Sequence, residues 1–329
     1  MAERTAIPET MRAVVLTEPT RGEDVALAEV PVPSTRPGWV LVRVCAFGMN
    51  HSEQVLREQE IRASYIKKPI IPGIECVGEV ADPGTSGFAV GQKVASLMGG
   101  MGRSFDGSYA EYVLVPERLV FPVETALGWA EMAAVPETYF TAWGSLTESL
   151  QLAPDDVLLI RGATCALGYA AIQLAKAAGV RVIGTTHRAS KLALLEAAGC
   201  DECVLDEGSI QGKVSGVTKA LELIGVKTVK DTMGVLAPGG IVCVTGILGG
   251  VSSLERFDPI KDIPNGVFLT GFFSNYPTAA SIARLFAFFD DHSIKPLMGA
   301  TFPFSRITDA CIALDAGSVQ GKIVVVIDG

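Results

Sequence analysis

Residues 155–191 read DDVLLIRGATCALGYAAIQLAKAAGVRVIGTTHRASK, and this segment indicates the fold of the second half of the chain. The apolar run 157–160 predicts a buried strand, which a turn of small residues and then a helix over 168–178 follow. A second apolar run, 181–185, completes a strand–turn–helix–strand unit. Such a unit points the free N–H groups of a helix N-terminus at a pyrophosphate. It therefore predicts a dinucleotide-binding, doubly wound parallel sheet.

The turn itself is predicted to contact the dinucleotide through a run of consecutive residues: Gly162, Ala163, Thr164, Cys165, Ala166, Leu167 and Gly168. Small side chains at three of these positions let the backbone approach the ligand and let the helix pack on the strand. Thr164 and Cys165 depart from the usual G-x-G-x-x-G pattern, because glycine is common at those central places. The flanking strands and helix favour a binding turn over a purely structural one.

The end of the second strand predicts which dinucleotide binds. An NAD site usually has an acidic residue there, about 20 residues after the glycine turn, to bond the ribose 2′-hydroxyl. This chain instead has VIGTTHRASK, in which Thr186, Arg188 and Lys191 offer a hydroxyl and two cations. Those groups suit a 2′-phosphate, so NADPH is the predicted cofactor. The alternative is that these residues are the solvent-exposed, basic first turn of the next helix and bind no phosphate.

Outside this stretch the chain has two regions of different character. The first 125 residues are β-rich, with strands predicted at 12–16, 25–30, 39–46, 75–81, 93–97 and 108–115 between Pro and Gly turns. After Pro122, short strands and helices alternate, with further strands predicted at 204–205, 220–224, 241–245 and 267–270. The tail carries helices at 279–289 and 307–315 and a strand at 323–327. The pattern leaves open whether it extends the second region or returns to the first.

Composition limits the function. The 329 residues suggest two domains, and a net charge of −9 without a basic block predicts no binding to nucleic acid or to an anionic membrane. No signal-like start and no apolar stretch of about 18 residues is present, so a cytoplasmic protein is expected. Seven cysteines predict reduced thiols. Cys200 and Cys203 form a C-x-x-C pattern, but no second pair of cysteines accompanies it. They are therefore predicted to lie where a helix ends and the next strand begins.

Further segments resemble the medium-chain dehydrogenase/reductase superfamily, in particular its zinc-free quinone oxidoreductases. They are MRAVVL (11–16), FGMNHSE (47–53), PGIECVGEV (72–80), GQKVAS (91–96), GSYAEYVLVP (107–116), TAWGSL (141–146), PGGIVCVTGI (238–247) and GKIVVVI (321–327). The resemblance implies an α/β protein with a GroES-like, β-rich catalytic domain (residues 1–125 and 277–329). The remaining residues, 126–276, would form a Rossmann NADPH-binding domain. It also implies a homodimer.

The resemblance further implies a metal-free enzyme. The positions that hold zinc ligands in zinc alcohol dehydrogenases of this superfamily are occupied by Asn50, Ile74 and Glu137. Isoleucine cannot ligate zinc and asparagine is a poor ligand. The four cysteines of the structural zinc lobe are also missing, because residues 93–115 contain none. The alternative is that Glu53, Glu75 and His51 together form a metal site in place of the usual ligands.

Site residues follow from the same resemblance. Asn50 is expected beside the nicotinamide and the substrate. Val55 occupies the place of a frequent tyrosine, so Ser52 and His51 are the candidate proton donors. The alternatives are that Ser52 caps a helix and that His51 is a surface residue. The other expected cofactor contacts are Thr141, Thr245, Gly246, Ile247, Phe272, Phe273 and Lys322. The loop Met98–Met101 is expected either to line the substrate mouth or to be a flexible solvent loop.

Together these features predict an NADPH-dependent enzyme that transfers hydride to a quinone or an α,β-unsaturated carbonyl without zinc. Such acceptors are already activated, so proximity and orientation supply most of the catalysis. Two alternatives remain. One is a zinc-independent alcohol or ketone oxidoreductase, and the other is a nucleotide-binding protein without turnover.

Overall fold

The structure, a computed structural model, describes residues 6–328 and divides into two compact units. One unit extends to Glu137 and resumes at Asn275, and the other is Thr138–Ser274. Residues 126–137 lie in the first unit, where α2 (Trp129–Ala133) packs on β3, β4 and β15. Among the described residues no helix is long and apolar enough to cross a bilayer.

The unit Thr138–Ser274 is built on a six-stranded parallel sheet of order β10-β9-β8-β11-β12-β13. Its strands are β8 (Val157–Arg161), β9 (Arg181–Thr186), β10 (Glu202–Leu205), β11 (Val217–Glu222), β12 (Leu236–Val244) and β13 (Phe268–Gly271). The strand order runs outward from β8 in both directions, as in a doubly wound Rossmann sheet. Leu159, Ile183, Ala220 and Val242 are fully buried on neighbouring strands and form the centre of its core.

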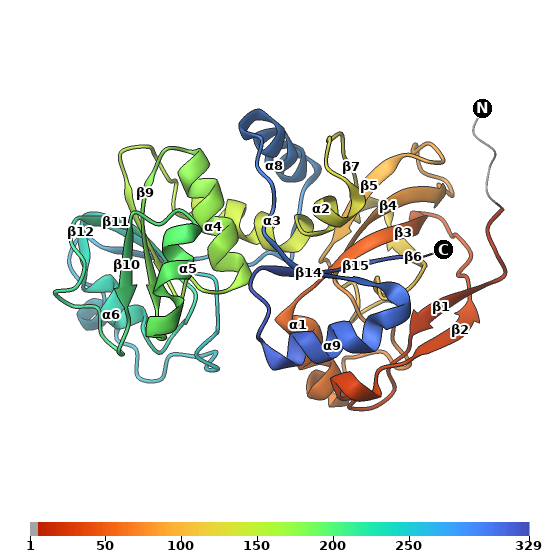
Figure 1. Cartoon of the computed structure of the whole chain (residues 1–329), viewed down its shortest axis with the longest axis horizontal. Helices are drawn as coiled ribbons and strands as arrows, with labels where there is room; N and C mark the ends of the chain where they lie inside the picture. The colour runs from red at the N-terminus through yellow and green to blue at the C-terminus, as the bar shows by residue number, and fades with distance from the viewer. Residues whose placement is uncertain (1–5, 329) are drawn as a thin grey trace. The chain divides into compact units, whose positions relative to one another are not determined.

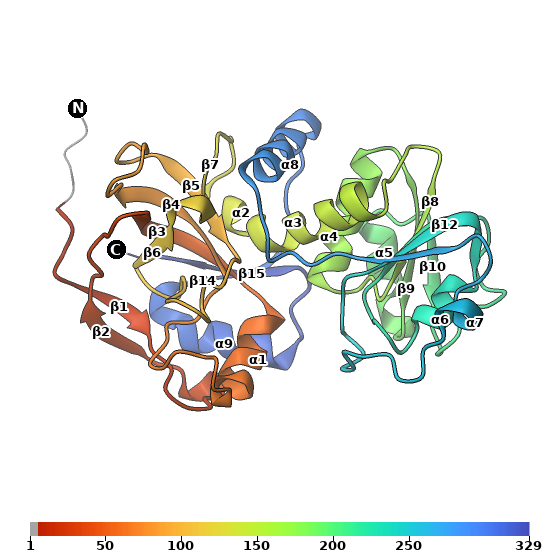
Figure 2. The same cartoon turned by 180° about the vertical axis from the view of Figure 1, so that it is seen from behind.

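Helices cover both faces of this sheet. They are α4 (Ala166–Ala177), α5 (Leu192–Ala197), α6 (Val229–Met233) and α7 (Pro259–Asp262), with a 3₁₀ turn η5 (Ala189–Lys191). α4 and α5 lie on one face and α6 on the other, which the two views of Figures 1 and 2 show. Helix α3 (Pro136–Gly144) precedes the sheet and continues into a π-helical turn, η4 (Ser145–Ser149). Cys200 and Cys203 lie at the junction of α5 and β10, and all seven cysteines are free.

The other unit contains a seven-stranded, mainly antiparallel sheet and a separate β1–β2 pair. The strands are β1 (Thr10–Val14), β2 (Leu27–Pro31), β3 (Trp39–Met49), β4 (Glu75–Asp82), β5 (Lys93–Leu97), β6 (Tyr112–Pro116), β7 (Val120–Pro122), β14 (Met298–Pro303) and β15 (Lys322–Val326). The helical elements of this unit are η1 (Gly22–Asp24), α1 (His51–Glu58), η2 (Glu60–Arg62), η3 (Glu117–Leu119), α8 (Ala279–His292), η6 (Phe304–Arg306) and α9 (Ile307–Ala316), in addition to α2. The order β14-β15-β3-β4-β5-β7, with β6 also on β3, makes the long strand β3 the centre of the unit.

The C-terminal segment is part of the same sheet. β15 pairs antiparallel with β3, with Val324 opposite Gly48, and β14 pairs parallel with β15. α9 lies beside α1 (Figure 1), and the buried Arg57 of α1 forms a salt bridge with Asp315 of α9. The return of the chain therefore places the first residue of β15 next to the last residues of β3.

Candidate active site

In the β-rich unit, four elements begin at one place. Asn50 follows the last residue of β3 and precedes α1, Glu75 is the first residue of β4, and Lys322 is the first residue of β15. Glu137 lies in the first turn of α3, where backbone N–H groups have no partner within the helix. The antiparallel pairing of β3 with both β4 and β15 brings these strand ends together.

These residues form one buried polar network. The Lys322 ammonium donates to Asn50 Oδ1 at 2.5 Å and forms a salt bridge with Glu75 Oε1 at 2.6 Å. Asn50 Nδ2 donates to Glu75 Oε1 at 2.8 Å, and the Glu137 N–H donates to Glu75 Oε2 at 2.7 Å. Glu75 is fully buried and Lys322 is 2% exposed. Asn50 is thus held at both ends of its amide, so its orientation is determined by the protein.

Glu53 adds a second buried carboxylate to this network. One oxygen accepts the Asn50 backbone N–H at 2.8 Å, and the other accepts the Ile74 N–H at 3.2 Å. Burial raises the pKa of Glu53 to about 7, although the Lys322 ammonium lowers it. The site therefore has two carboxyl groups and one cation, and Glu53 exchanges its proton near neutral pH.

Glycine at position 48 is required for this arrangement. A Cβ there would lie 2.4 Å from Lys322 Cε, 2.6 Å from Glu75 Oε1 and 2.8 Å from the Ala133 carbonyl oxygen. Any side chain would displace the lysine or the carboxylate. The glycine in FGMN thus has a steric role, which the sequence alone did not indicate.

The two candidate proton donors occupy different environments. Ser52 is the second residue of α1, so Asn50, and not Ser52, is the residue that precedes the helix. Its Oγ is buried and has no hydrogen-bond partner among residues 6–328. A buried hydroxyl of this kind is usually satisfied by water or a ligand. His51 is exposed, and its Nδ1 lies 2.9 Å from Gln54 Oε1.

The residues at the positions that hold zinc ligands in zinc alcohol dehydrogenases are unsuited to binding a metal. Ile74 is a buried hydrocarbon, and the oxygens of Asn50 and Glu75 already contact the Lys322 ammonium. Within residues 6–328 no three His, Cys, Asp or Glu side chains are placed to hold a metal ion. His51 points to Gln54, so it does not join Glu53 and Glu75 in a common site.

In the Rossmann unit, the predicted turn has the form that a phosphate needs. Gly162 has φ +80°, and a Cβ on Gly168 would lie 2.2 Å from the Ala163 carbonyl oxygen. Cys165 precedes α4, and its Sγ accepts the Gly168 N–H at 3.4 Å. α4 has twelve residues, and its N-terminus lies directly after this turn. The residues present therefore fit a dinucleotide pyrophosphate.

Thr164, at a position of this turn where glycine is common, contacts the end of the next strand. Thr164 Oγ1 lies 3.2 Å from Thr186 Oγ1 at the end of β9, so the two hydroxyls join the turn to the strand end. Beyond Thr186 the residues are His187, Arg188, Ala189, Ser190 and Lys191, of which only Lys191 is partly buried. Arg188 Nε donates to His187 Nε2 at 3.2 Å. This segment carries two cations and no carboxylate.

The acidic residue that follows the neighbouring strand β10 is paired with a buried arginine. Asp206 follows β10, and its N–H donates to the Thr186 carbonyl at 2.9 Å. Its carboxylate accepts two hydrogen bonds from the fully buried Arg161, at 2.8 and 3.2 Å. Burial opposes ionisation, but the hydrogen bonds from Arg161 and Gly208 hold the pKa of Asp206 below its ordinary value. Sequence patterns did not identify Arg161, because it reads as the end of an apolar strand.

Other predicted cofactor residues cluster around α3 and η4. Thr245 Oγ1 lies 2.8 Å from Ser145 Oγ, which also donates to the Thr141 carbonyl at 2.7 Å. Ser145 therefore joins Thr141 to Thr245, a link that the sequence did not reveal. Phe272 packs on Phe140 with ring centres 5.8 Å apart, and a Cβ on Gly144 would meet its ring at 2.0 Å.

Of the remaining residues that were predicted to contact the cofactor, two are exposed at the surface and one packs closely against the backbone of a neighbouring strand end. Phe273 is 69% exposed and Ile247 is 61% exposed. Gly246 approaches β11 closely, because a Cβ there would lie 2.2 Å from the Leu223 carbonyl oxygen. Gly99 of the loop Met98–Met101 donates its N–H to Asn275 Oδ1 at 3.1 Å, and Met101 is buried.

Comparison with known proteins identifies the same two domains. The family model of the alcohol dehydrogenase GroES-like domain matches residues 36–125, and that of the zinc-binding dehydrogenase matches residues 166–289. Prostaglandin reductase-3 of Bos taurus is 32% identical over 290 residues, which cover 82% of this chain and 74% of that protein. Quinone oxidoreductase of Homo sapiens is 26% identical over 314 residues, which cover 91% and 92%. The crystal structure of AibC has a TM-score of 0.86 and 25% identity, covering 98% and 97%.

The fold and the two matched domains define an oxidoreductase that uses a nicotinamide dinucleotide. The chain belongs to the medium-chain dehydrogenase/reductase superfamily, and its relatives include quinone oxidoreductases and prostaglandin reductases. The predicted fold class, a GroES-like domain with a Rossmann domain, is therefore confirmed.

Proposed function

We propose that this protein is an NADPH-dependent, zinc-independent reductase of quinones or α,β-unsaturated carbonyls. The observation that carries the proposal is the Lys322 ammonium, which contacts both Asn50 Oδ1 and Glu75 Oε1. The oxygens nearest to the zinc-ligand positions are thus paired with a cation that belongs to the protein. An enzyme without a Lewis acid is best suited to acceptors that are already activated for hydride addition.

NADPH is supported by the charges beyond β9. Thr186, Arg188 and Lys191 would hold the 2′-phosphate, and Arg161 removes the repulsion that Asp206 would exert on it. The turn Gly162–Gly168 and the N-terminus of α4 would hold the pyrophosphate. Thr141, Thr245, Gly246, Ile247, Phe272, Phe273 and Lys322 are proposed to serve the rest of the cofactor. When bound, the reduced nicotinamide supplies the hydride.

The protein's own groups position the acceptor. Both protons of Asn50 Nδ2 face carboxylates, Glu75 at 2.8 Å and Glu53 at 3.4 Å, so the amide offers a ligand only its oxygen. Ser52 Oγ, in contrast, has no partner among residues 6–328 and can donate. We assign Ser52 as the group that supplies a proton or hydrogen bond to the substrate oxygen, with Asn50 as an acceptor. His51 is the second candidate, at the surface of the same helix turn.

A matched substrate panel tests the proposal. NADPH oxidation is followed with a quinone, an enone, and the saturated ketone that corresponds to the enone, before and after treatment with a chelator. We expect turnover with the first two, little with the saturated ketone, and no loss on chelation. Turnover of secondary alcohols or ketones would support the alternative oxidoreductase, and binding of NADPH without turnover would support the non-catalytic alternative. Activity that zinc restores after chelation would contradict zinc independence.

Three further assignments complete the proposal. We assign catalysis to the β-rich unit and most of the cofactor contacts to Thr138–Ser274, with Asn50 and Lys322 of the β-rich unit beside the nicotinamide. A homodimer is supported by β13, an edge strand whose Phe268 is 60% exposed. A cytoplasmic location is supported by seven free cysteines, as expected in a reducing compartment. Sedimentation of the chain and of Phe268→Asp tests the dimer.

A further inference from the structure

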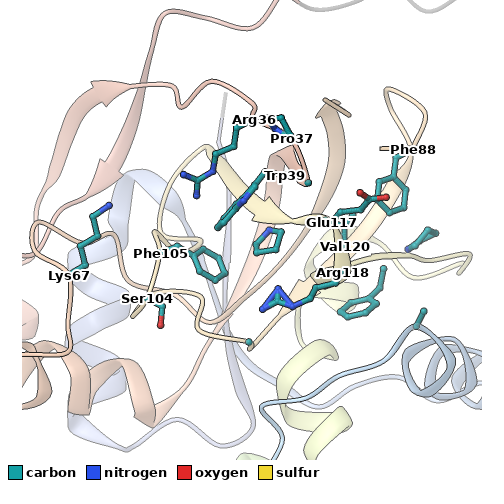
Figure 3. A pocket seen from close by; sticks show the side chains of 16 residues that line it. Arg36, Pro37, Trp39, Lys67, Phe88, Ser104, Phe105, Glu117, Arg118 and Val120 are labelled. Atoms are coloured by element: carbon teal, nitrogen blue, oxygen red, sulfur yellow. The ribbon is translucent and has the colours of Figure 1, made fainter. Parts of the chain in front are cut away.

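A groove in the β-rich unit is lined by more cations than carboxylates. Its volume is about 1150 Å³, and loops between the strands line it. Figure 3 shows its side chains, with Arg36, Lys67 and Arg118 disposed around Trp39 and Phe105. Glu117 is its one acidic residue. A groove with three cations and one carboxylate is a local exception in a chain of net charge −9.

The three cations come from separate segments. Arg36 precedes β3, Lys67 lies between η2 and β4, and Arg118 belongs to η3. Within residues 6–328 none of them forms a salt bridge or a side-chain hydrogen bond, although Arg118 is adjacent to Glu117 in the chain. Glu117 lines the same groove but is paired with none of the three, so these cations are available to an anionic ligand.

Aromatic rings form the floor between these cations. The Arg36 guanidinium lies over the Trp39 ring at 4.0 Å, and Trp39 meets Phe105 edge to face with ring centres 5.3 Å apart. The stacking holds Arg36 in place without neutralising its charge. The floor is therefore a rigid apolar surface with a fixed positive group at its margin.

A second hollow of about 380 Å³ shares Arg36, Trp39, Lys67 and Phe105 with the groove. Its other lining residues are mostly apolar, among them Val30, Ile70 and Leu114. Its one carboxylate, Asp106, accepts the Ile71 N–H at 3.0 Å. The shared cations thus stand where a charged groove meets an apolar hollow. The volume of the hollow is in the range of small-molecule sites, and that of the more open groove is slightly above it.

From this arrangement we propose that the groove binds a small amphipathic organic anion, a carboxylate or sulfonate with an aromatic or alkyl body. The acidic group lies among Arg36, Lys67 and Arg118, and the apolar body lies on Trp39 and Phe105 and extends into the second hollow. The cations and rings of this groove lie at the opposite end of β3 from the proposed reductase site, because Trp39 begins β3 and Asn50 follows its other end. The groove also reaches Gly99 of the loop Met98–Met101. Its ligand class also differs from neutral quinones and enones.

A pair of probes that differ only in charge tests this site. Pyrenebutyrate and pyrenebutanol are titrated by fluorescence into the full chain with excess NADP⁺ present. We expect pyrenebutyrate to bind about tenfold more tightly, which corresponds to about 1.4 kcal/mol. The preference should weaken as salt screens the cations. Equal affinities in the unmodified chain would overturn the proposal.

Variants locate the binding. The triple variant Arg36→Ala, Lys67→Ala, Arg118→Ala should lose the preference for pyrenebutyrate, and the single charge reversal Lys67→Glu should reduce it. Arg284→Ala, which removes an exposed arginine of α8 in the same unit, is the matched control and should keep it. A preference that survives the triple variant, or one that Arg284→Ala weakens equally, would show that the groove is not the site. Failure of the reductase assay would leave this test unaffected.

Discussion

The carboxyl group of Glu53 should make the stability of this protein depend on pH in an unusual direction. Burial raises its pKa from 4.5 to about 7 in the folded chain. Between those values the folded chain binds a proton that the unfolded chain has released. The stability that this proton contributes is complete below pH 4.5 and is lost as the pH rises through 7. At 1.36 kcal/mol per pH unit, the loss is about 3 kcal/mol.

Glu53→Gln removes this titration and keeps the shape of the side chain. Its amide cannot accept both the Asn50 and the Ile74 N–H, so a pH-independent cost of about 1–3 kcal/mol is expected. The free energy of unfolding of the variant, measured relative to that of the wild type, should therefore rise by about 3 kcal/mol between pH 4.5 and pH 8.

Urea unfolding at a series of pH values gives the free energy of unfolding of the wild type and of Glu53→Gln. Glu124→Gln, at an exposed position, is the control and should follow the wild type. If the free energies of unfolding of the wild type and of Glu53→Gln changed in parallel with pH, whatever the constant difference between them, Glu53 would not have a raised pKa in the folded chain.

Three further changes test the rest of the site. Lys322→Met leaves Glu75 buried without its cation and should lower the free energy of unfolding in urea by about 3–5 kcal/mol. Adding Glu75→Gln should recover part of that loss, and no recovery would contradict the pairing. Arg188→Ala with Lys191→Ala should weaken NADPH about tenfold in calorimetry, or about 1.4 kcal/mol, and leave NADH unchanged. Arg181→Ala, at the other end of β9, is the control, and equal losses for both dinucleotides would reject a 2′-phosphate site. Gly168→Ala should reduce dinucleotide affinity and thermal stability, because its Cβ would lie 2.2 Å from a backbone oxygen. Gly87→Ala has open space and should be neutral, so an equally silent Gly168→Ala would show that the turn does not need its glycine.

Local patterns in the sequence were sufficient for most of the elements. The apolar runs predicted β8 and β9, and the small-residue turn predicted the start of α4, because a buried parallel strand must be apolar along its length. β14 was not predicted, since MGATFP alternates between partly buried and exposed positions and offers no clear apolar face. Residues 126–137 carry no pattern that assigns them to either unit.

The candidate site was predictable only in part. Thr186, Arg188 and Lys191 follow one strand closely, so their common location can be inferred from the chain order. Arg161 and Ser145 were missed, because their importance depends on partners 45 and 100 residues away. A charged residue within an apolar strand was the one available signal for Arg161.

Residues close together in the chain were sufficient to predict the two-part organisation, the turn that we propose to bind the dinucleotide, and the lack of an acidic residue directly after β9. Only the tertiary structure placed Lys322 against Asn50, which lies 272 positions earlier. That contact arises because β15 pairs with β3, and pairing between distant strands follows from packing of the whole unit. Burial then changed the chemistry of these groups. It raises the pKa of Glu53 to about 7, and the Lys322 ammonium contacts oxygens of both Asn50 and Glu75.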